Sequence, residues 1–259
     1  MENITEKCML RETCKNKDSE KCNRFCYPFV VLHGQQGNGG FWRTSCVPAK
    51  YKEVVFSNLP IKEANPKAYA IAEKYINKIA YFIEEKGVGL FLYSIPNPDN
   101  LFGTGTGKTT TAVAILNEYV LDATRRHLRG EKELKRNPAL FIRASEFQNK
   151  YNAQFRGTID MQQEASVKFY RLKERMKDVS LLLLDDIAIR DTTEAFKNEL
   201  YEIIDHRATE EKATIFTSNF PRGELTKLLG ERIVSRIEGM TLEVGFVGKD
   251  FRKGGLLNG

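Results

Sequence analysis

This sequence of 259 residues lacks a long apolar run, a secretion signal and any cysteine in its last 213 residues. No apolar run approaches the ~18 residues that a membrane-spanning helix needs, so we expect no membrane contact. The first residues, Met1-Glu-Asn-Ile-Thr-Glu, do not show the basic and then apolar pattern of a secretion signal, so we expect a cytoplasmic protein. No cysteine follows Cys46. The chemistry of the cysteines therefore belongs to an N-terminal segment that is separate from the rest of the chain.

The composition is that of a folded, water-soluble protein. Hydrophobic residues make up 41% of the chain and charged residues 29%, which excludes a disordered chain. The formal net charge of +6 is compatible with a polyanionic partner but does not establish one. The length is sufficient for one α/β core with a small appendage.

Alternating apolar patterns predict parallel βαβ units. Short apolar runs at residues 88–93, 139–143, 181–185 and 213–217 read as buried strands. Between them, helices are predicted over residues 108–126, 146–155 and 161–177. Another helix follows Asn65, as N-cap, and Pro66, and a further one is capped by Asp191 with Glu194 three residues on. This order predicts an α/β fold, a three-layer sandwich with a central parallel sheet.

A glycine-rich loop precedes the helix predicted at residue 108. Its glycines allow backbone N–H groups to converge on phosphates, and the helix N-terminus favours anions. Lys108 is expected to reach the β- and γ-phosphates of ATP or GTP, and Thr109 to place its hydroxyl on Mg²⁺. The predicted nucleotide-binding residues of the loop are Gly103, Thr104, Gly105, Thr106, Gly107, Lys108, Thr109 and Thr110.

Two acidic residues complete the predicted nucleotide site. Asp185 ends the strongly apolar run at residues 181–184, where it can hold the same Mg²⁺ as Thr109, and Asp186 is the candidate for activating water. Asn219 follows the next predicted strand and is expected to hydrogen-bond the attacking water, unless it is simply an asparagine in a turn before Pro221. The two motifs together predict binding of ATP or GTP.

The approach to the loop departs from the usual spacing. A glycine is expected five residues before Gly107, and Phe102 stands there instead. Residues 95–102 therefore look like an insertion between strand and loop, and the sequence does not say how it affects the nucleotide site.

Four cysteines lie within a short polar stretch: Cys8, Cys14, Cys22 and Cys26. Cytosolic thiols are kept reduced, so the cluster predicts a zinc site more readily than disulfides. An iron–sulfur cluster and free thiols stay open, because paired Cys-x2-Cys motifs are missing. Cys46 or His33 could replace one ligand. The predicted units are a Cys-rich module over residues 1–50, a linker over 51–64 and an ATPase domain over 65–259.

The stretch from about residue 65 to 253 resembles the DnaC/DnaI-type replicative helicase loaders, which are AAA+ ATPases, including those encoded by phages and mobile elements. The resemblance rests on Gly-Thr-Gly-Lys-Thr, Leu-Leu-Leu-Asp-Asp-Ile, Thr-Ser-Asn, Gly-Glu-Arg-Ile-Val-Ser-Arg and Gly-Lys-Asp-Phe-Arg. It implies that Arg236 acts as an arginine finger on a neighbouring subunit and that Arg252 senses nucleotide within its own subunit. It also fits a small zinc-bound N-terminal module.

The resemblance implies a loader that delivers a replicative ring helicase onto single-stranded DNA, binds the helicase through its N-terminal part and self-associates with ATP. Residues 146–156 lie where that family contacts DNA; alternatively, Phe147, Tyr151 and Phe155 pack into the core. Two other functions stay open. One is a transposition helper of the IstB type, and the other is a nucleotide-binding regulator with little turnover.

Overall fold

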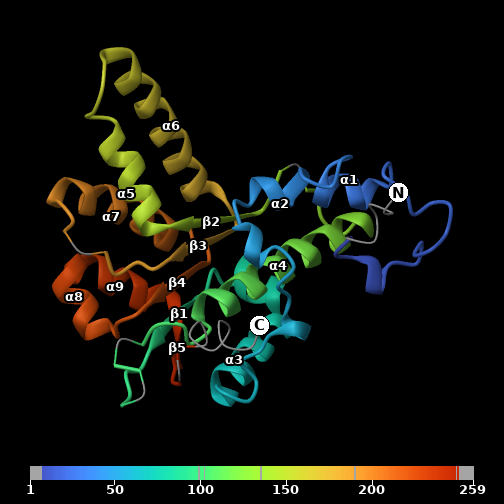
Figure 1. Cartoon of the computed structure of the whole chain (residues 1–259), viewed down its shortest axis with the longest axis horizontal. Helices are drawn as coiled ribbons and strands as arrows, with labels where there is room; N and C mark the ends of the chain where they lie inside the picture. Colours follow the sequence, from blue (N-terminus) through green and yellow to red (C-terminus); the bar gives the residue numbers. More distant parts are fainter. Residues whose placement is uncertain are drawn as a thin grey trace, which may run out of the picture.

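The computed structural model describes residues 8–250, apart from residues 99, 102, 135, 190 and 249. Its centre is a parallel sheet of five strands in the order β2-β3-β4-β1-β5 (Figure 1). The strands are β1 (Gly89–Ser94), β2 (Ala139–Arg143), β3 (Leu181–Asp185), β4 (Thr214–Ser218) and β5 (Thr241–Phe246). The helices are α1 (Tyr27–His33), α2 (Gly40–Thr44), α3 (Pro66–Asn77), α4 (Lys108–Leu128), α5 (Ala144–Ala153), α6 (Ile159–Asp178), α7 (Glu194–Thr209), α8 (Arg222–Leu229) and α9 (Glu231–Met240).

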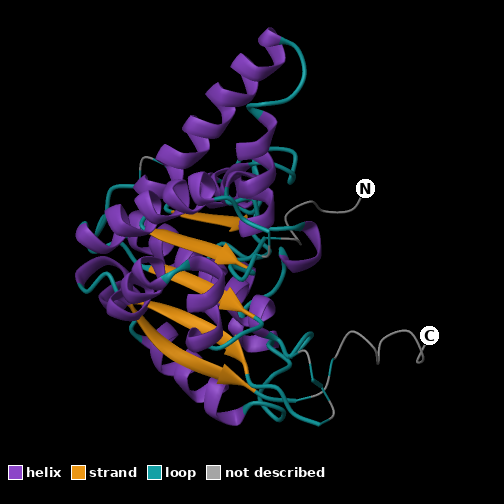
Figure 2. Ribbon diagram, turned by 90° about the vertical axis from the view of Figure 1, so that its left-hand side faces the viewer, coloured by secondary structure: helices purple, strands orange, loops and turns teal. Residues whose placement is uncertain are grey.

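Helices cover both faces of the sheet, so the predicted three-layer α/β architecture is confirmed (Figure 2). One buried cluster joins α3 and α4 to one face, and a second cluster joins α5, α6, α7, α8 and α9 to the other. All five strands end at the same edge of the sheet because they are parallel. Polar residues that follow different strands are thereby brought to one side of the molecule.

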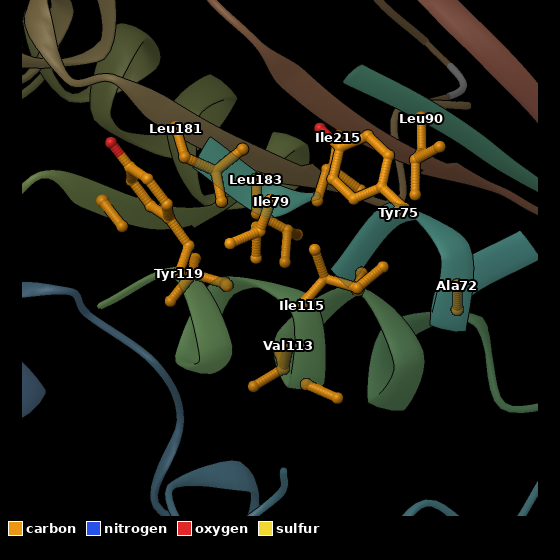
Figure 3. Close-up of a cluster of buried hydrophobic side chains, with 14 of the residues drawn as sticks. Ala72, Tyr75, Ile79, Leu90, Val113, Ile115, Tyr119, Leu181, Leu183 and Ile215 are labelled. Carbon is orange, nitrogen blue, oxygen red and sulfur yellow. The ribbon is translucent and has the colours of Figure 1, made fainter. Parts of the chain in front are cut away.

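Helix α4 supplies much of the first core. Figure 3 shows Ile115 and Tyr119 of α4 facing Leu183 and Ile215 of the sheet, with Tyr75 of α3 beside them. All five side chains are essentially buried. Burying a side chain of this size stabilises the fold by roughly 1.5–3 kcal/mol. The helix that begins at the phosphate loop is therefore firmly seated on the sheet.

The N-terminal segment adds to this core instead of building its own. Its buried apolar side chains Leu10, Leu32, Trp42 and Val47 belong to the same cluster as the apolar residues of α4. Polar contacts follow the same path, because Tyr27 Oη lies 2.8 Å from His127 Nε2 near the end of α4. Packing against α4 therefore compensates for the scarcity of apolar residues in the segment.

Three of the differences between the structure and the sequence-based prediction concern β5, α7 and α3. Strand β5 was not predicted, because Thr241–Phe246 lies at the sheet edge and has no continuous apolar run. Asp191 does not cap α7; Thr193 does, since its hydroxyl accepts the Phe196 N–H at 3.2 Å. Asn65 holds the N-cap position of α3 but does not cap it, because its Oδ1 accepts the Val247 N–H at 2.8 Å after β5.

Helices α5 and α6 form a hairpin that extends away from the sheet (Figures 1 and 2). Exposed apolar side chains gather at its tip, with Phe155 in the turn between the helices and Ile159 and Met161 at the start of α6. Among the described residues, no helix is both long enough and apolar enough to pass through a lipid bilayer.

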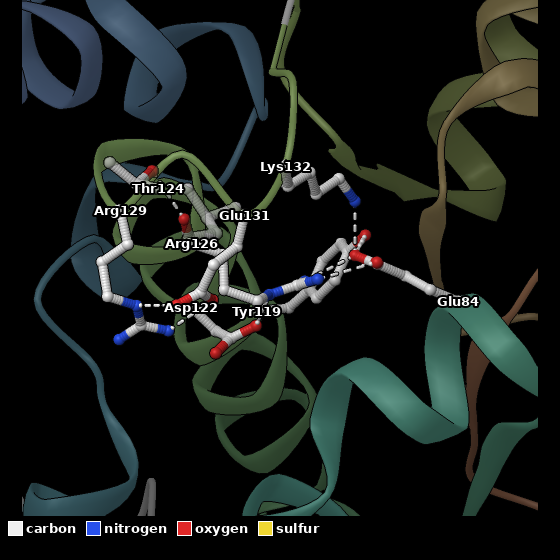
Figure 4. Close-up of polar contacts among 9 residues, drawn as sticks. Glu84, Tyr119, Asp122, Thr124, Arg126, Arg129, Glu131 and Lys132 are labelled. Atoms are coloured by element: carbon white, nitrogen blue, oxygen red, sulfur yellow. Dashed lines mark hydrogen bonds and ion pairs between the residues drawn. The ribbon is translucent and has the colours of Figure 1, made fainter.

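A partly exposed ionic cluster fastens α4 to the helical turn Tyr81–Glu85 before β1. Glu84 accepts hydrogen bonds from Arg126 at 2.6 and 2.9 Å, from Tyr119 at 2.8 Å, and from Lys132 (Figure 4). Burial by itself would raise the pKa of Glu84, but these hydrogen bonds outweigh it and lower the pKa to about 2.

We expect this cluster to make stability depend on pH below about 4.5. A carboxyl whose folded-state pKa is lowered stabilises the fold above its unfolded pKa and loses that contribution as pH falls from 4.5 towards 2. With solvent screening, the contribution is roughly 1–2 kcal/mol. Urea unfolding of Glu84→Gln at pH 7 should show this loss and a flatter acid dependence. Glu131→Gln is the matched control, because the pair of Glu131 with Arg129 is exposed, and it should match the wild type. A Glu84→Gln protein as stable as the control would contradict the assignment.

Candidate nucleotide site

The phosphate loop connects the end of β1 to the start of α4. Gly107 is the N-cap of α4 with φ of 98°, in the left-handed region that favours glycine. A Cβ at this position would also lie 2.5 Å from Ile61 Cγ2 of the linker. The predicted loop-to-helix junction is therefore present, and its glycine is required both by backbone conformation and by close packing.

The Lys108 ammonium lies inside the loop. Its Nζ donates to the Gly103 carbonyl oxygen at 3.0 Å and to Thr106 Oγ1 at 3.4 Å, and it also contacts Ser94 Oγ at the end of β1. The side chain is nearly buried, at 7% exposed. Phosphate oxygens would compete with these neutral oxygens for the ammonium, and a charged acceptor makes the stronger hydrogen bond.

Asp185 is the centre of a short hydrogen-bond chain. Its Oδ1 accepts from Thr109 Oγ1 at 2.7 Å and from Thr217 Oγ1 at 2.8 Å. A carboxylate beside a phosphate-loop hydroxyl is the donor set that holds Mg²⁺ with a nucleotide, so the residues present fit this ion. Thr217 was not predicted as a site residue. Its position before Ser218 and Asn219, at the end of a buried strand, was the available signal.

The other two predicted polar residues also meet here. Asn219 Nδ2 donates to Asp186 Oδ1 at 3.3 Å, across the ends of β3 and β4. Asp186 has φ of 53°, and its N–H donates to Thr217 Oγ1 at 2.8 Å. The Thr217 hydroxyl therefore links both aspartates, which fixes the relative position of the metal candidate and the water-activating candidate.

These groups surround one cavity of about 600 Å³, a size suited to a nucleotide. Arg143 lies in its wall, with Nε 3.9 Å from Asp185 Oδ2. Lys50, at the end of the Cys-rich module, and Tyr51 of the linker form another part of the wall. None of these three residues was predicted from the sequence. Arg143 could have been found, because it ends β2 directly opposite Asp185 in the register. A larger cavity of about 1050 Å³ lies between the N-terminal segment and α6, but it contains no phosphate-loop residue.

Two predicted arginines lie outside this cavity. Arg236 is half-exposed on α9, and its Nε lies 2.7 Å from Asp205 Oδ1 of α7. It does not line the nucleotide cavity of its own chain. Arg252 lies outside the described residues.

The aromatic residues of α5 and of the turn that follows it differ in burial. Phe147 is fully buried and stacks on Phe169, with ring centroids 5.1 Å apart, and Tyr151 packs on the same ring at 5.6 Å. Phe155 is 65% exposed at the turn of the hairpin. The predicted core packing therefore holds for the first two, and Phe155 is the aromatic side chain that stays accessible to a partner.

The four N-terminal cysteines line one small cavity, and none forms a disulfide. Burial raises the pKa of the Cys8 thiol, and the nearby Cys26, Cys14 and Cys22 raise it further. Within the described part of the chain, however, no three Cys, His, Asp or Glu side chains are arranged to hold a metal ion. The predicted zinc site therefore has no support from metal-site geometry.

The two substitute ligands considered from the sequence lie elsewhere. His33 stacks on Phe29, with ring centroids 5.1 Å apart, and its Nε2 accepts the Met9 N–H at 3.2 Å. Burial lowers its pKa to about 4, so the ring is neutral at pH 7. Cys46 is exposed, with Sγ 3.9 Å from an Arg175 nitrogen. Neither residue lines the cavity of the other four cysteines.

Comparison with known proteins identifies relatives among replication proteins, although no protein-family model matches the chain. The replicative helicase loader DnaC of Escherichia coli (strain K12) is 28% identical over 133 residues, which cover 51% of this chain and 46% of the relative. DnaC of Buchnera aphidicola subsp. Baizongia pistaciae is 25% identical over 205 residues, covering 78% of this chain and 71% of the relative. The chain thus spans about half the length of the E. coli relative.

Solved structures share the fold. The DnaC helicase loader superposes with a TM-score of 0.55 at 19% identity, covering 77% of this chain and 99% of that chain. DnaI gives 0.55 at 21% identity, covering 79% and 94%. The replication initiator DnaA bound to AMPPCP and single-stranded DNA gives 0.51 at 22%, covering 78% and 51%. The sequence similarity to DnaC, together with the fold shared with DnaC and DnaI, confirms the resemblance to DnaC/DnaI-type replicative helicase loaders.

Proposed function

We propose that this protein is an ATP-dependent loader that delivers a replicative ring helicase onto single-stranded DNA during replication initiation. The observation that carries the proposal is the assembled nucleotide cavity on a fold shared with DnaC and DnaI. Similarity in sequence to DnaC supports the choice of a loader over other ATPases. A phage or mobile-element origin and a cytoplasmic location stay predictions.

The residues of the cavity would divide the work of ATP hydrolysis. Lys108 and the N–H groups of the loop bind the phosphates, and Thr109 and Asp185 hold Mg²⁺. The metal neutralises charge that develops on the phosphates. Asp186 and Asn219 would orient the attacking water. Their side chains contact each other at the ends of neighbouring strands, so both can reach the same water molecule.

Arg236 and Arg252 would complete the site on assembly. Arg236 is exposed and outside its own cavity, which suits an arginine that reaches the nucleotide of a neighbouring subunit. The protein would therefore self-associate when ATP is bound. Arg252 would sense the nucleotide within its own chain, as the resemblance implies.

Single-stranded DNA would contact the α5–α6 hairpin. Phe155 offers an exposed ring for base stacking, and Arg156 beside it can neutralise a phosphate. A replicative helicase would bind the N-terminal module over residues 1–50, which is joined by the linker over 51–64 to the ATPase domain over 65–259.

A loading assay tests the function. The purified protein is mixed with the replicative helicase of its own cell and circular single-stranded DNA, and helicase retained on the circle is measured by gel filtration. We expect retention that requires this protein and ATP, and that Arg236→Ala abolishes while nucleotide binding stays intact. Failure to bind the helicase would contradict the proposal, and binding to a transposase instead would favour the IstB-type alternative.

The N-terminal module would hold one Zn²⁺ through Cys8, Cys14, Cys22 and Cys26. The support is that these thiols face one cavity and form no disulfide. Thiolates are the preferred ligands of structural zinc, and modest movements around a small cavity would complete a tetrahedron.

Elemental analysis tests the metal. We expect about one equivalent of zinc per chain and neither iron nor acid-labile sulfide. Cys22→Ser should lose the zinc, whereas Cys46→Ser should keep it and serves as the matched control, because Cys46 lies outside the cavity. Less than about half an equivalent in the wild-type protein would remove zinc from the proposal.

A further inference from the structure

Residues 95–102 interrupt the usual path from strand to phosphate loop, and the structure supplies a reason for them. We infer that Asn97 and Asn100 form a clasp that fixes the start of the phosphate loop against the segment after β5. Asn100 would thereby act as a positioning residue for nucleotide binding. The inference rests on the proposed nucleotide site and adds to it a residue that neither the sequence motifs nor the resemblance assigns.

The Asn100 side chain holds Thr104 at both of its backbone polar groups. Its Oδ1 accepts the Thr104 N–H at 3.2 Å, and its Nδ2 donates to the Thr104 carbonyl oxygen at 2.7 Å. The residue is 7% exposed. Buried hydrogen bonds to both sides of one residue restrict its φ and ψ, so Asn100 determines how the backbone enters the loop.

The same amide reaches the chain after β5. Asn100 Nδ2 also donates to the Gly248 carbonyl oxygen at 3.0 Å, and Asn97 Nδ2 donates to that oxygen at 3.4 Å. Asn97 in turn supports Asn100, because its Oδ1 and its carbonyl oxygen both accept the Asn100 N–H at 3.0 Å. Residues separated by about 150 positions in the sequence are thus joined at one point.

A second contact ties the same two segments. Asp250 Oδ2 accepts from Thr104 Oγ1 at 2.9 Å. A Cβ on Gly105, whose φ is 65°, would lie 1.7 Å from Asp250 Oδ1. Gly105 therefore permits the close approach of the Asp250 carboxylate, and the loop is held from outside the nucleotide cavity, whose wall does not include Asp250.

The clasp explains how a loop without the usual glycine at position 102 can still be shaped for phosphates. Bonds that exist before the ligand arrives reduce the entropy lost when the loop orders around it. They also join the loop to Gly248 and Asp250, so that ordering of the loop by nucleotide should reduce the mobility of the residues directly after β5.

Nucleotide titration of the full-length protein tests the clasp. Fluorescent ATP and ADP are titrated into wild type, Asn100→Ala and Asn137→Ala. Asn137 is the matched control, because it is similarly buried and its side chain also makes three hydrogen bonds, but at the start of β2. We expect similar falls in melting temperature for both variants, but a Kd raised about tenfold or more only for Asn100→Ala.

The outcomes separate the clasp from the proposed function. If wild type binds no nucleotide, the proposed function fails. If wild type binds and Asn100→Ala binds within twofold of it, the nucleotide site stands and the clasp is overturned. Equal weakening in Asn137→Ala would also overturn the clasp, because the effect would then be a general loss of stability.

Asp250→Ala and the double variant test this coupling between the loop and the residues after β5. If Asn100 and Asp250 anchor the same segment, the change in log Kd of the double variant should be smaller than the sum of the changes in the two single variants. Hydrogen exchange should show protection of residues 246–248 on ATP binding in wild type and its loss in Asn100→Ala. Additive changes in log Kd, with exchange unaffected by the substitution, would overturn the coupling.

Discussion

We expect Lys108→Ala to abolish nucleotide binding under ordinary assay conditions while the chain remains folded. Removing a buried ammonium that bonds two phosphates should raise the Kd for ATP about 100-fold, or roughly 3 kcal/mol. In the structure this ammonium donates to the hydroxyl oxygens of Ser94 and Thr106 and to the Gly103 carbonyl oxygen. These oxygens are neutral, so losing the hydrogen bonds to them should lower the free energy of unfolding by much less than the binding free energy lost for ATP.

Isothermal titration with ATP and Mg²⁺ measures the effect, and circular dichroism confirms folding. Lys197→Ala is a suitable control, because Lys197 pairs with Glu194 at 2.9 Å on α7 and does not line the cavity. We expect the control to bind ATP as tightly as wild type. Equal ATP affinity in Lys108→Ala would remove the phosphate-binding role of the loop and with it the central claim about the site.

The largest loss of stability is expected at Arg207, far from the nucleotide. This residue of α7 is fully buried, and burial lowers its pKa to about 9, so it is still charged at pH 7. Its guanidinium donates to carbonyl oxygens at the end of α6 and at the starts of β3 and β4. These are the oxygens of Met176 at 2.8 Å, Lys177 at 3.2 Å, Val179 at 2.8 Å, Ser180 at 3.4 Å and Ala213 at 2.6 Å.

Arg207→Met keeps most of the volume but leaves these carbonyl groups without their donor. Each buried polar group left unpaired costs about 1–3 kcal/mol, and several share the loss here, so we expect the free energy of unfolding to fall by about 3–5 kcal/mol. Equilibrium urea unfolding without nucleotide measures it. Arg156→Met, at an exposed position, should change stability little. A change below about 1 kcal/mol in Arg207→Met would show that water replaces the guanidinium.

Local patterns in the sequence predicted the parts of the fold that depend on neighbouring residues. The apolar run before Asp185 predicted β3, and the glycine-rich loop predicted the start of α4 at Lys108. Strand β5 was missed because it lies at the sheet edge, where Leu242 and Glu243 are exposed and no continuous apolar run forms. The cap of α7 was misplaced because Asp191 and Thr193 are both good capping residues, and only the backbone path selects Thr193.

The candidate site also has one part that the sequence predicted and another that depends on the order of the strands. The sequence by itself determined which residue types are present for phosphate and metal chemistry, because the loop is contiguous and Asp185 ends a run of leucines. Strand order decided the rest. With β4 between β3 and β1, Thr217 lies beside Asp185, and with β2 next to β3, Arg143 reaches the same carboxylate.

Tertiary structure alone decided the contacts that join distant segments. Asn65 bonds the chain after β5 instead of capping its own helix, Arg207 collects carbonyl oxygens from three elements, and Asn100 joins the phosphate loop to Gly248. An asparagine or arginine side chain satisfies its hydrogen bonds with whichever polar groups lie in reach, and burial makes that pairing obligatory. Its partners are therefore set by how the strands and helices pack, which no local pattern specifies.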